Sequence, residues 1–360
     1  MRRQQLLRKR RRRLVVAAGI AAVLLVATGS WLAFTGGSEG AAGSRVTAGA
    51  GARRVRLPAE PSTTAAPVTT TTTAVASTAP YAVGVTQLTV EDASRPTAAR
   101  GDTPASNTRR LGLTIRYPIA GAAGSGEAAG APVASGTFPL VVFAHGFAVS
   151  AATYQALEHD LATGGFIVVA PDFPISSAAL PGPASESDIS NQAHDVSFLI
   201  TQFQGASVPA LFAGHVAAGK AGVVGHSDGG TTAAEVAGDS CCADPRIGAA
   251  AVLSGDEGHD PGTWFASGNP PMLFVQGTAD DINPYSFSQK LYDDAKSPKT
   301  LVNILGAGHL DPYTTGSQRP VIDALVVDFL RAKLDNDGAA SAQIVADENV
   351  AGVLQLAASA

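Results

Sequence analysis

The sequence predicts an α/β protein with a mostly parallel central sheet and helices on both of its faces. Short, continuous apolar runs such as residues 140–144 recur along the chain, and such runs are typical of strands buried on both faces. Longer amphipathic stretches such as residues 154–165 separate these runs, and strands that alternate with helices favour a parallel sheet. We therefore expect ligands to bind at the carboxyl ends of the strands.

The first 34 residues differ from this pattern in charge and hydropathy. Eight Lys or Arg residues lie within Met1 to Arg13, and Leu14 to Phe34 carry no charge. An apolar run of this length can span a bilayer, and its basic flank predicts a cytoplasmic end. The long run and the lack of a clean cleavage site favour an uncleaved membrane anchor, with a cleaved signal peptide as the alternative. In both cases we expect the rest of the chain to be exported.

Residues 35–80 predict a disordered linker, because a segment so rich in Gly, Ala, Thr and Pro cannot bury enough apolar surface to fold. Residues 1–80 hold 12 Lys/Arg and 2 Asp/Glu, a net charge of +10, whereas the remainder holds 13 and 28, a net charge of −15. This acidity argues against nucleic acid as a partner. We expect a globular domain over residues 81–335 and a C-terminal tail over 336–360.

The elements of the globular domain follow in order from their patterns. Residues 83–90 and 111–117 alternate between apolar and polar side chains, as an antiparallel pair of strands does. Apolar runs predict the later strands, and amphipathic stretches predict the helices between them. The runs are LVVFA, FIVVAPDF, AGVV, GAAAVLSG, PMLFVQG and LVNILG, and the helices are YQALEHDLATGG, DISNQAHDVSFLITQFQ, the stretch after GHSDGG, and residues 320–334.

The stretch Gly225-His226-Ser227-Asp228-Gly229 matches G-x-S-x-G at a strand-to-helix turn. In a nucleophile elbow, a serine sits on a strained turn, and glycines on either side let the strand and helix pack closely. The first N–H groups of the helix then face the group that the serine attacks. Ser38 lies in a second G-x-S-x-G match, but no strand precedes it and no helix follows it. We therefore predict Ser227 as the nucleophile.

A serine nucleophile needs a base that takes its proton and an acid that orients the base. His309 follows the strand LVNILG in a Gly-rich turn, and Asp280 is the first carboxylate after the strand PMLFVQG. We predict His309 as the base and Asp280 as the acid. Asp256 and Glu257, which follow GAAAVLSG, and Asp281 remain as alternatives for the acid.

The other six histidines are weaker candidates for the base. His226 precedes the nucleophile, so its side chain should point back toward the sheet and pack there. His145 comes directly after a strand, and we expect it to shape a loop. The remaining four, on helices or at the surface by pattern, are His159, His194, His215 and His259.

The same geometry predicts the donors that would stabilise an oxyanion. One donor should be the backbone N–H of Asp228, the residue after the nucleophile. The second should come from the loop after residues 140–144, where the sequence HGF places Phe147. We expect the Asp228 carboxylate to point away from this site, because its charge would oppose an oxyanion.

Residues 83 to about 334 resemble the α/β-hydrolase superfamily. The motifs that carry the resemblance are VGVTQLTVEDASRP, LTIRYP, FPLVVFAHGF, GFIVVAPDFP, HDVSFL, GHSDGG, GTADDINP and GAGH. They are most similar to the secreted esterase branch, which includes platelet-activating-factor acetylhydrolase-like proteins, relatives of dienelactone hydrolase, and cutinase-like polyester hydrolases. The resemblance implies the α/β-hydrolase fold and the chain order Ser227, Asp280, His309 for the catalytic residues.

The expected activity is therefore hydrolysis of carboxylic esters through an acyl-enzyme intermediate. The alternatives are a cell-envelope acyltransferase, a polyester hydrolase, and a non-catalytic protein on the same scaffold. Acetylhydrolases of the plasma type place their acid after the strand that matches GAAAVLSG, where this chain has Leu253-Ser254, and this departure favours Asp280. Polyester hydrolases usually carry an aromatic residue where this chain has His145-Gly146, and this departure counts against that assignment.

Cys241 and Cys242 are the only cysteines of the chain. In an exported protein they could form a vicinal disulfide, and two buried thiols are the alternative. Their spacing and surroundings do not predict a metal site. The sequence also contains no phosphate loop or dinucleotide fingerprint, so we expect no cofactor.

Overall fold

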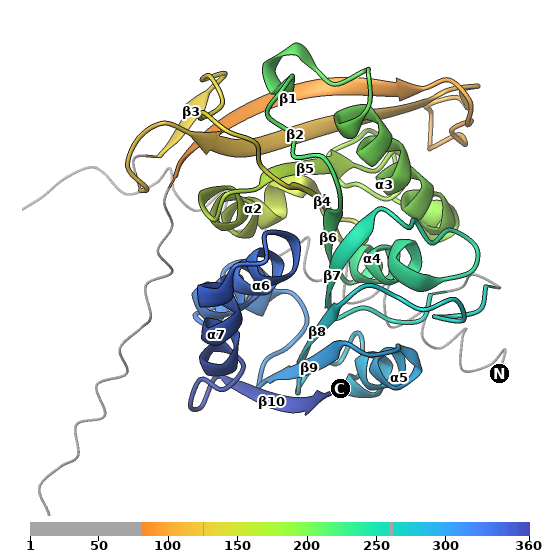
Figure 1. The fold of residues 1–360 in the computed structure, drawn as a ribbon. Helices are drawn as coiled ribbons and strands as arrows, with labels where there is room; N and C mark the ends of the chain where they lie inside the picture. The colour runs from red at the N-terminus through yellow and green to blue at the C-terminus, as the bar shows by residue number, and fades with distance from the viewer. Residues whose placement is uncertain (1–80, 125, 259–261) are drawn as a thin grey trace, which may run out of the picture. The chain divides into compact units, whose positions relative to one another are not determined.

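The computed structural model of this protein describes residues 81–124, 126–258 and 262–360, all of which belong to one unit, Ala76–Ala360. A ten-stranded sheet with the order β10-β9-β8-β7-β6-β4-β5-β2-β1-β3 forms the centre of this part of the chain (Figure 1). Its strands are β1 (Ala82–Asp92), β2 (Arg109–Ile119), β3 (Glu127–Ala129), β4 (Leu140–Ala144), β5 (Ile167–Asp172), β6 (Ala221–His226), β7 (Ile247–Leu253), β8 (Met272–Gly277), β9 (Lys299–Ile304) and β10 (Leu354–Ser359).

The six strands from β4 to β9 run parallel to one another, as their continuous apolar sequences predict. The strands β1 and β2 form the expected antiparallel pair, with Val83 opposite Pro118 and Val90 opposite Leu111. Strand β2 then pairs antiparallel with β5 and so joins the pair to the parallel sheet. The predicted fold class is confirmed: it is a mostly parallel sheet between two layers of helices.

The helices divide between the two faces of the sheet (Figure 1). Helices α3 (Ile189–Gln204), α4 (Asp228–Gly238) and α5 (Tyr285–Asp294) pack into one apolar core. Helices α2 (Gln155–Thr163) and α6 (Arg319–Leu334) pack into the other, and α7 (Gly338–Asp347) adds the partly buried Ile344 to it. Because both faces are covered, strands such as β4 are buried at every residue. Helices α2, α3 and α6 begin and end within two residues of their predicted positions, and α4 begins at Asp228, within the GHSDGG motif.

The C-terminal residues 336–360 differ from the tail that we expect there. Helix α7 and strand β10 lie within them, and β10 pairs antiparallel with β9, with Leu354 opposite Ile304. The domain therefore extends to Ser359 and does not end near residue 335. The sequence does not predict strand β10, because its extended conformation depends on pairing with β9 and on the burial of Leu354 in the apolar core.

The expected membrane segment, residues 1–34, and the expected linker, residues 35–80, lie outside the described residues. Among the residues that the structure does describe, no helix is long and apolar enough to cross a membrane.

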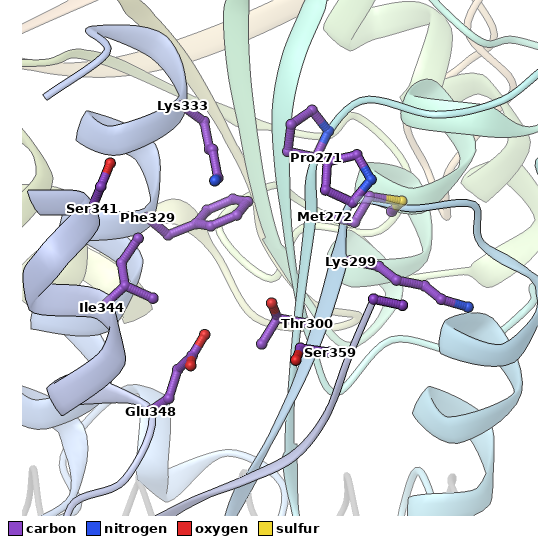
Figure 2. A pocket seen from close by; sticks show the side chains of 12 residues that line it. Pro271, Met272, Lys299, Thr300, Phe329, Lys333, Ser341, Ile344, Glu348 and Ser359 are labelled. Atoms are coloured by element: carbon purple, nitrogen blue, oxygen red, sulfur yellow. The ribbon is translucent and has the colours of Figure 1, made fainter. Parts of the chain in front are cut away.

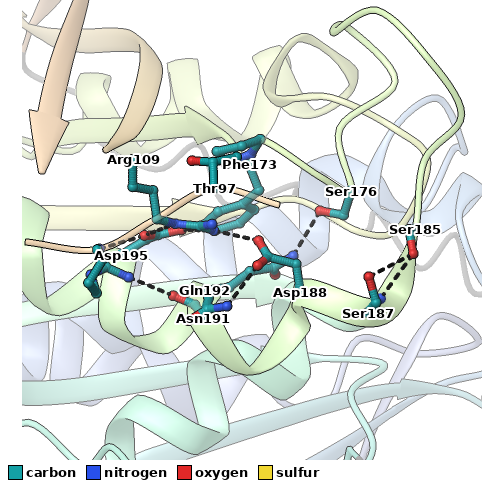
Figure 3. Close-up of polar contacts among 12 residues, drawn as sticks. Thr97, Arg109, Phe173, Ser176, Ser185, Ser187, Asp188, Asn191, Gln192 and Asp195 are labelled. Carbon is teal, nitrogen blue, oxygen red and sulfur yellow. Dashed lines mark hydrogen bonds and ion pairs between the residues drawn. The ribbon is translucent and has the colours of Figure 1, made fainter. Parts of the chain in front are cut away.

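A buried ionic cluster ties the β1–β2 pair to helix α3 (Figure 3). The guanidinium of Arg109, at the start of β2, lies 2.7 Å from Asp188 and 2.6 Å from Asp195, and its side chain is fully buried. On the same helix, Gln192 donates a hydrogen bond to Ser176 and accepts one from Thr232 of α4. Since Ser176 belongs to the loop that follows β5, the cluster fixes this loop relative to α3 and α4.

Candidate active site

Ser227 lies between β6 and α4 with φ of 58° and ψ of −123°, a conformation that costs free energy for a residue other than glycine. The neighbouring glycines make this turn possible. A Cβ atom on Gly225 would lie 1.9 Å from the carbonyl oxygen of Gly229, and one on Gly229 would lie 2.0 Å from the carbonyl oxygen of Ala144. The strand, the turn and the helix therefore pack as a nucleophile elbow requires. The Ser227 side chain is half-buried at the carboxyl edge of the sheet.

The structure brings Ser227, His309 and Asp280 together from three neighbouring strand ends. His309 follows β9, and its Nε2 lies 2.8 Å from Oγ of Ser227. Asp280 follows β8, and its Oδ2 lies 2.7 Å from Nδ1 of His309. A carboxylate only accepts hydrogen bonds, so Nδ1 of His309 carries the proton and Nε2 has a lone pair for the Ser227 hydroxyl. This tautomer is the one that a general base requires.

Asp280 is held by four hydrogen bonds and has a fully buried side chain. Oδ1 accepts from the backbone N–H groups of Ile282 and Asn283, at 2.9 and 2.8 Å, and Oδ2 accepts from Gln276 and His309. Burial by itself raises the pKa of this carboxyl. The hydrogen bond and charge of His309, together with the two backbone donors, outweigh burial and lower the pKa below its ordinary value. Asp280 therefore stays ionised at neutral pH.

The alternative acids lie elsewhere. Asp256 accepts hydrogen bonds from Thr231 at 2.8 Å and from the backbone of Gly258 at 2.9 Å. Glu257 pairs with Lys290, and Asp281 is exposed to solvent. The position after β7 that some acetylhydrolases use holds Ser254, whose hydroxyl bonds with Tyr313. Of the carboxylates that the sequence leaves open, Asp280 is therefore the one that bonds with His309.

The two predicted oxyanion donors flank the elbow. Asp228 is the first residue of α4 and is buried, and Phe147 is half-buried in the loop after β4. That loop lies against the nucleophile, because a Cβ atom on Gly146 would lie 3.1 Å from Cβ of Ser227. The backbone of Gly146 and the N-terminus of α4 therefore both lie next to Ser227.

His145 and His226, the two other histidines near the elbow, are buried and hydrogen-bonded. Nδ1 of His145 lies 2.7 Å from the carbonyl oxygen of Gly146, and its Nε2 accepts from the backbone N–H of Phe173 at 3.1 Å. This histidine joins the loop after β4 to the loop after β5. The ring of His226 packs against Tyr154, His309 and Tyr313, and its two nitrogens bond with the Tyr154 hydroxyl and the backbone of His309. The sequence pattern does not identify Tyr154 as part of the site, because a tyrosine at the start of a predicted helix is expected to pack in the apolar core.

A disulfide, the groups that could bind a metal ion, and a cavity were considered apart from Ser227, His309 and Asp280. Cys241 and Cys242 are joined in a disulfide. No three His, Cys, Asp or Glu side chains are placed to hold a metal ion in the parts of the chain that the structure describes.

A cavity of about 290 Å³ opens where β8 and β9 begin, lined by Met272, Lys299 and Glu348 among others (Figure 2). Since Ser227 follows the end of a parallel strand, this cavity lies at the opposite edge of the sheet and has no part in the site.

Comparison with known proteins gives partial matches in sequence. A profile of the chlorophyllase family matches residues 128–260, a range that includes Ser227 but neither Asp280 nor His309. The uncharacterized protein YfhR of Escherichia coli (strain K12) is 35% identical over 81 residues, which are 22% of this chain and 28% of that protein. Chlorophyllase-1 of Citrus sinensis is 33% identical over 102 residues, which are 28% of this chain and 29% of that protein. The chain thus spans under a third of the length of these curated relatives.

Comparison of structures extends over most of the chain. A ferulic acid esterase from Streptomyces cinnamoneus superposes with a TM-score of 0.61 and 22% sequence identity, covering 79% of this chain and 98% of that one. At this identity the likeness concerns the fold. Together with the strand order, the elbow and the chlorophyllase match over residues 128–260, it shows that this chain has the α/β-hydrolase fold.

Proposed function

We propose that this chain is a serine hydrolase that cleaves carboxylic esters through an acyl-enzyme intermediate. The observation that supports the proposal most strongly is the continuous chain of hydrogen bonds from Ser227 through His309 to Asp280, on an elbow with positive φ. The similarity to chlorophyllases and to the fold of a ferulic acid esterase supports an ester as the bond that is cleaved.

In the proposed acylation, Oγ of Ser227 forms a bond to the ester carbonyl carbon while its proton passes to Nε2 of His309. The electron pair of the carbonyl moves onto oxygen, and the backbone N–H groups of Phe147 and Asp228 stabilise the resulting oxyanion. The ionised Asp280 supports the imidazolium that forms. The bond to the alcohol then breaks, and the alcohol leaves with the proton that His309 returns.

Deacylation repeats these steps with water. His309 takes a proton from water as the water oxygen attacks the acyl carbon, and the same backbone donors stabilise the second oxyanion. Collapse of this intermediate breaks the bond to Ser227, which recovers its proton from His309 and releases the carboxylic acid. No cofactor enters either half of the reaction.

The test is turnover of chromogenic esters by wild-type protein and by the variant Ser227→Ala. Loss of the nucleophile should lower kcat by roughly 10⁴- to 10⁶-fold, as in other serine hydrolases. Ser38→Ala is a matched control, because Ser38 occupies the second G-x-S-x-G match, and this variant should keep wild-type turnover. Wild-type turnover by Ser227→Ala would exclude the proposed nucleophile.

The class of ester can be narrowed with a panel that runs from acetate and long-chain esters to feruloyl esters, chlorophyll and aromatic polyesters. An added alcohol separates hydrolysis from acyl transfer, because a transferase would pass the acyl group to the alcohol in preference to water. We expect the free acid as the main product at millimolar alcohol.

We further propose that the domain acts outside the cytoplasm and is held at the membrane by residues 14–34. The support is the uncharged apolar run behind eight basic residues. Fractionation of cells that express the full chain tests the proposal. We expect the chain in the membrane fraction, released by detergent and not by salt. Recovery in the cytosol would contradict both attachment and export.

A further inference from the structure

Two buried side chains, Tyr154 and His226, connect the loop of the proposed oxyanion donor to the loop of the proposed base. The backbone N–H of Gly146 donates to the hydroxyl of Tyr154 at 3.3 Å. That hydroxyl lies 2.7 Å from Nδ1 of His226, whose Nε2 lies 2.8 Å from the carbonyl oxygen of His309. Tyr154 and His226 are each 1% exposed. Water therefore has little access to the bonds of the Tyr154 hydroxyl with Gly146 and His226.

The chemistry of these groups identifies the donor and the acceptor of each hydrogen bond in the series. The carbonyl oxygen of His309 only accepts, so Nε2 of His226 carries a proton and donates it. Burial, followed by the charge of His309, holds the pKa of His226 well below its ordinary value, so the ring is neutral and Nδ1 is a bare acceptor. Burial also raises the pKa of Tyr154, which keeps its proton and donates it to Nδ1. The remaining lone pairs of the hydroxyl accept the N–H of Gly146.

Packing holds the rings of these residues in place. The ring of His226 lies 4.7 Å from the ring of His309 and 4.7 Å from that of Tyr313, measured between centroids. The ring of Tyr154 packs against Phe143 at 4.9 Å. At Gly146 a Cβ atom would lie 3.1 Å from the Tyr154 hydroxyl, so glycine allows the close approach that the first bond needs.

We propose that Tyr154 and His226 are positioning residues that hold Gly146-Phe147 and His309 at a fixed separation next to Ser227. The proposal rests on the serine hydrolase function above. Formation of a tetrahedral intermediate requires that the N–H of Phe147 reaches the oxyanion while His309 holds the proton of Ser227, so the two groups must be correctly placed relative to each other. The chain from Gly146 to the His309 carbonyl is a direct mechanical link between them. The hydroxyl of Ser227 takes no part in these bonds.

The first test is Tyr154→Phe, which removes one oxygen and keeps the packed ring. We expect kcat to fall about 10- to 100-fold with KM changed less than about threefold, because small misplacements of reacting groups have effects of this size. Inhibition by a trifluoromethyl ketone, which forms an oxyanion on the serine, should weaken by a similar factor. Tyr117→Phe is the matched control, since Tyr117 is buried and its hydroxyl donates to Ala131 away from the site. It should leave kcat and inhibition unchanged.

The second test is a double-mutant cycle with His226→Leu, which removes the donor to His309. If Tyr154 and His226 act through one series of hydrogen bonds, the double variant Tyr154→Phe/His226→Leu should lose no more activity than His226→Leu alone. His226→Gln, which keeps a side-chain N–H near the position of Nε2, should recover part of kcat. Additive losses would show that the residues act separately and would overturn the proposal.

These outcomes are separable from failure of the proposed function. If wild-type protein cleaves no ester and resists a fluorophosphonate probe, the proposed function itself fails. If wild-type protein is active and Tyr154→Phe matches it in kcat and in inhibition by the ketone, only the positioning role is wrong. A thermal melt of each variant separates loss of geometry from loss of folding.

Discussion

At the scale of single residues, hydrogen bonds distinguish Asp280 from its neighbour Asp281. The two carboxylates are adjacent in sequence, yet Asp280 is buried under four donors and Asp281 is exposed. Two of these donors are backbone N–H groups of the turn that follows β8, so the turn itself aims the carboxylate at His309. Gln276, the residue before the end of β8, completes the arrangement from the sheet.

We predict that Asp280→Asn lowers kcat by about 10⁴-fold, as loss of the orienting acid does in other triads. An amide can donate to Nδ1 of His309 and so favour the wrong tautomer of the base. Asp281→Asn and Asp256→Asn should each keep most of the activity, because neither carboxylate bonds with His309 in the structure. Steady-state kinetics on the three purified variants, each checked by thermal melt, measure the difference. Loss of activity in Asp256→Asn alone would move the acid to the loop after β7.

At the scale of elements, the segment between β1 and β2 braces the loop that follows β5. The buried guanidinium of Arg100 donates to three backbone carbonyls of that loop, those of Pro174, Ser177 and Gly182. The same loop pairs with the segment after Phe147, through a bond from Ala148 N–H to the Ser176 carbonyl and another from Ala178 N–H to the Val149 carbonyl. The edge of the sheet thereby supports one wall of the site.

We predict that Arg100→Met destabilises the domain by about 2 to 4 kcal/mol, because three buried carbonyls lose their donor while the apolar stem remains. Activity should fall as well, since the loop next to Phe147 loses its support. Arg110→Met is the matched control, because Arg110 is largely exposed and pairs with Glu91 at 3.6 Å. Urea unfolding of both variants measures the effect. Equal free energies of unfolding for the two variants would show that Arg100 does not brace the loop.

At the scale of the whole domain, a pair of buried carboxyls links α6 to the C-terminal helix α7. Asp328 of α6 and Asp347 of α7 are 5% and 7% exposed, and Asp347 is close enough to raise the pKa of Asp328. Burial first, and then the hydrogen bond and charge of Asp347, raise the pKa of Asp328 to about 6, although Arg331 opposes the shift. The folded state therefore binds a proton at Asp328 that the unfolded chain releases near its ordinary pKa of 3.8.

The sign of the pH dependence follows from this raised pKa. The contribution of Asp328 to stability is complete at pH values below about 4 and is lost as pH rises through about 6. Asp328→Asn, which mimics the protonated acid, should remove this loss and make the domain more stable than wild type at pH 7 by about 1 to 2 kcal/mol. Thermal melts from pH 4 to 8 test the prediction, with Asp102→Asn at an exposed position as the control. Parallel curves for wild type and Asp328→Asn would contradict it.

Much of the architecture could be predicted because local patterns and tertiary structure agree. Strand β4 and helices α2 and α6 could be predicted from an apolar run and from helical periodicity. These patterns depend on which residues are buried. The position of Ser227 could be predicted for the same reason, since the tight turn of an elbow requires glycines close to the serine in the sequence. Strand β10 was not, because its extended conformation depends on the edge of β9. The link from Tyr154 to His226 was also hidden, because its members lie 72 residues apart.

The sequence by itself determined the fold class, the strand-to-helix turn that holds Ser227, the proposed nucleophile, and a short set of candidates for the base and the acid. These properties depend on spacing within single strand-turn segments, which a chain carries locally. Only the tertiary structure decided among Asp256, Asp280 and Asp281, and joined Gly146 to His309 through Tyr154 and His226. Hydrogen bonds of this kind act over about 3 Å between atoms that are distant in the chain, and packing alone brings such atoms together.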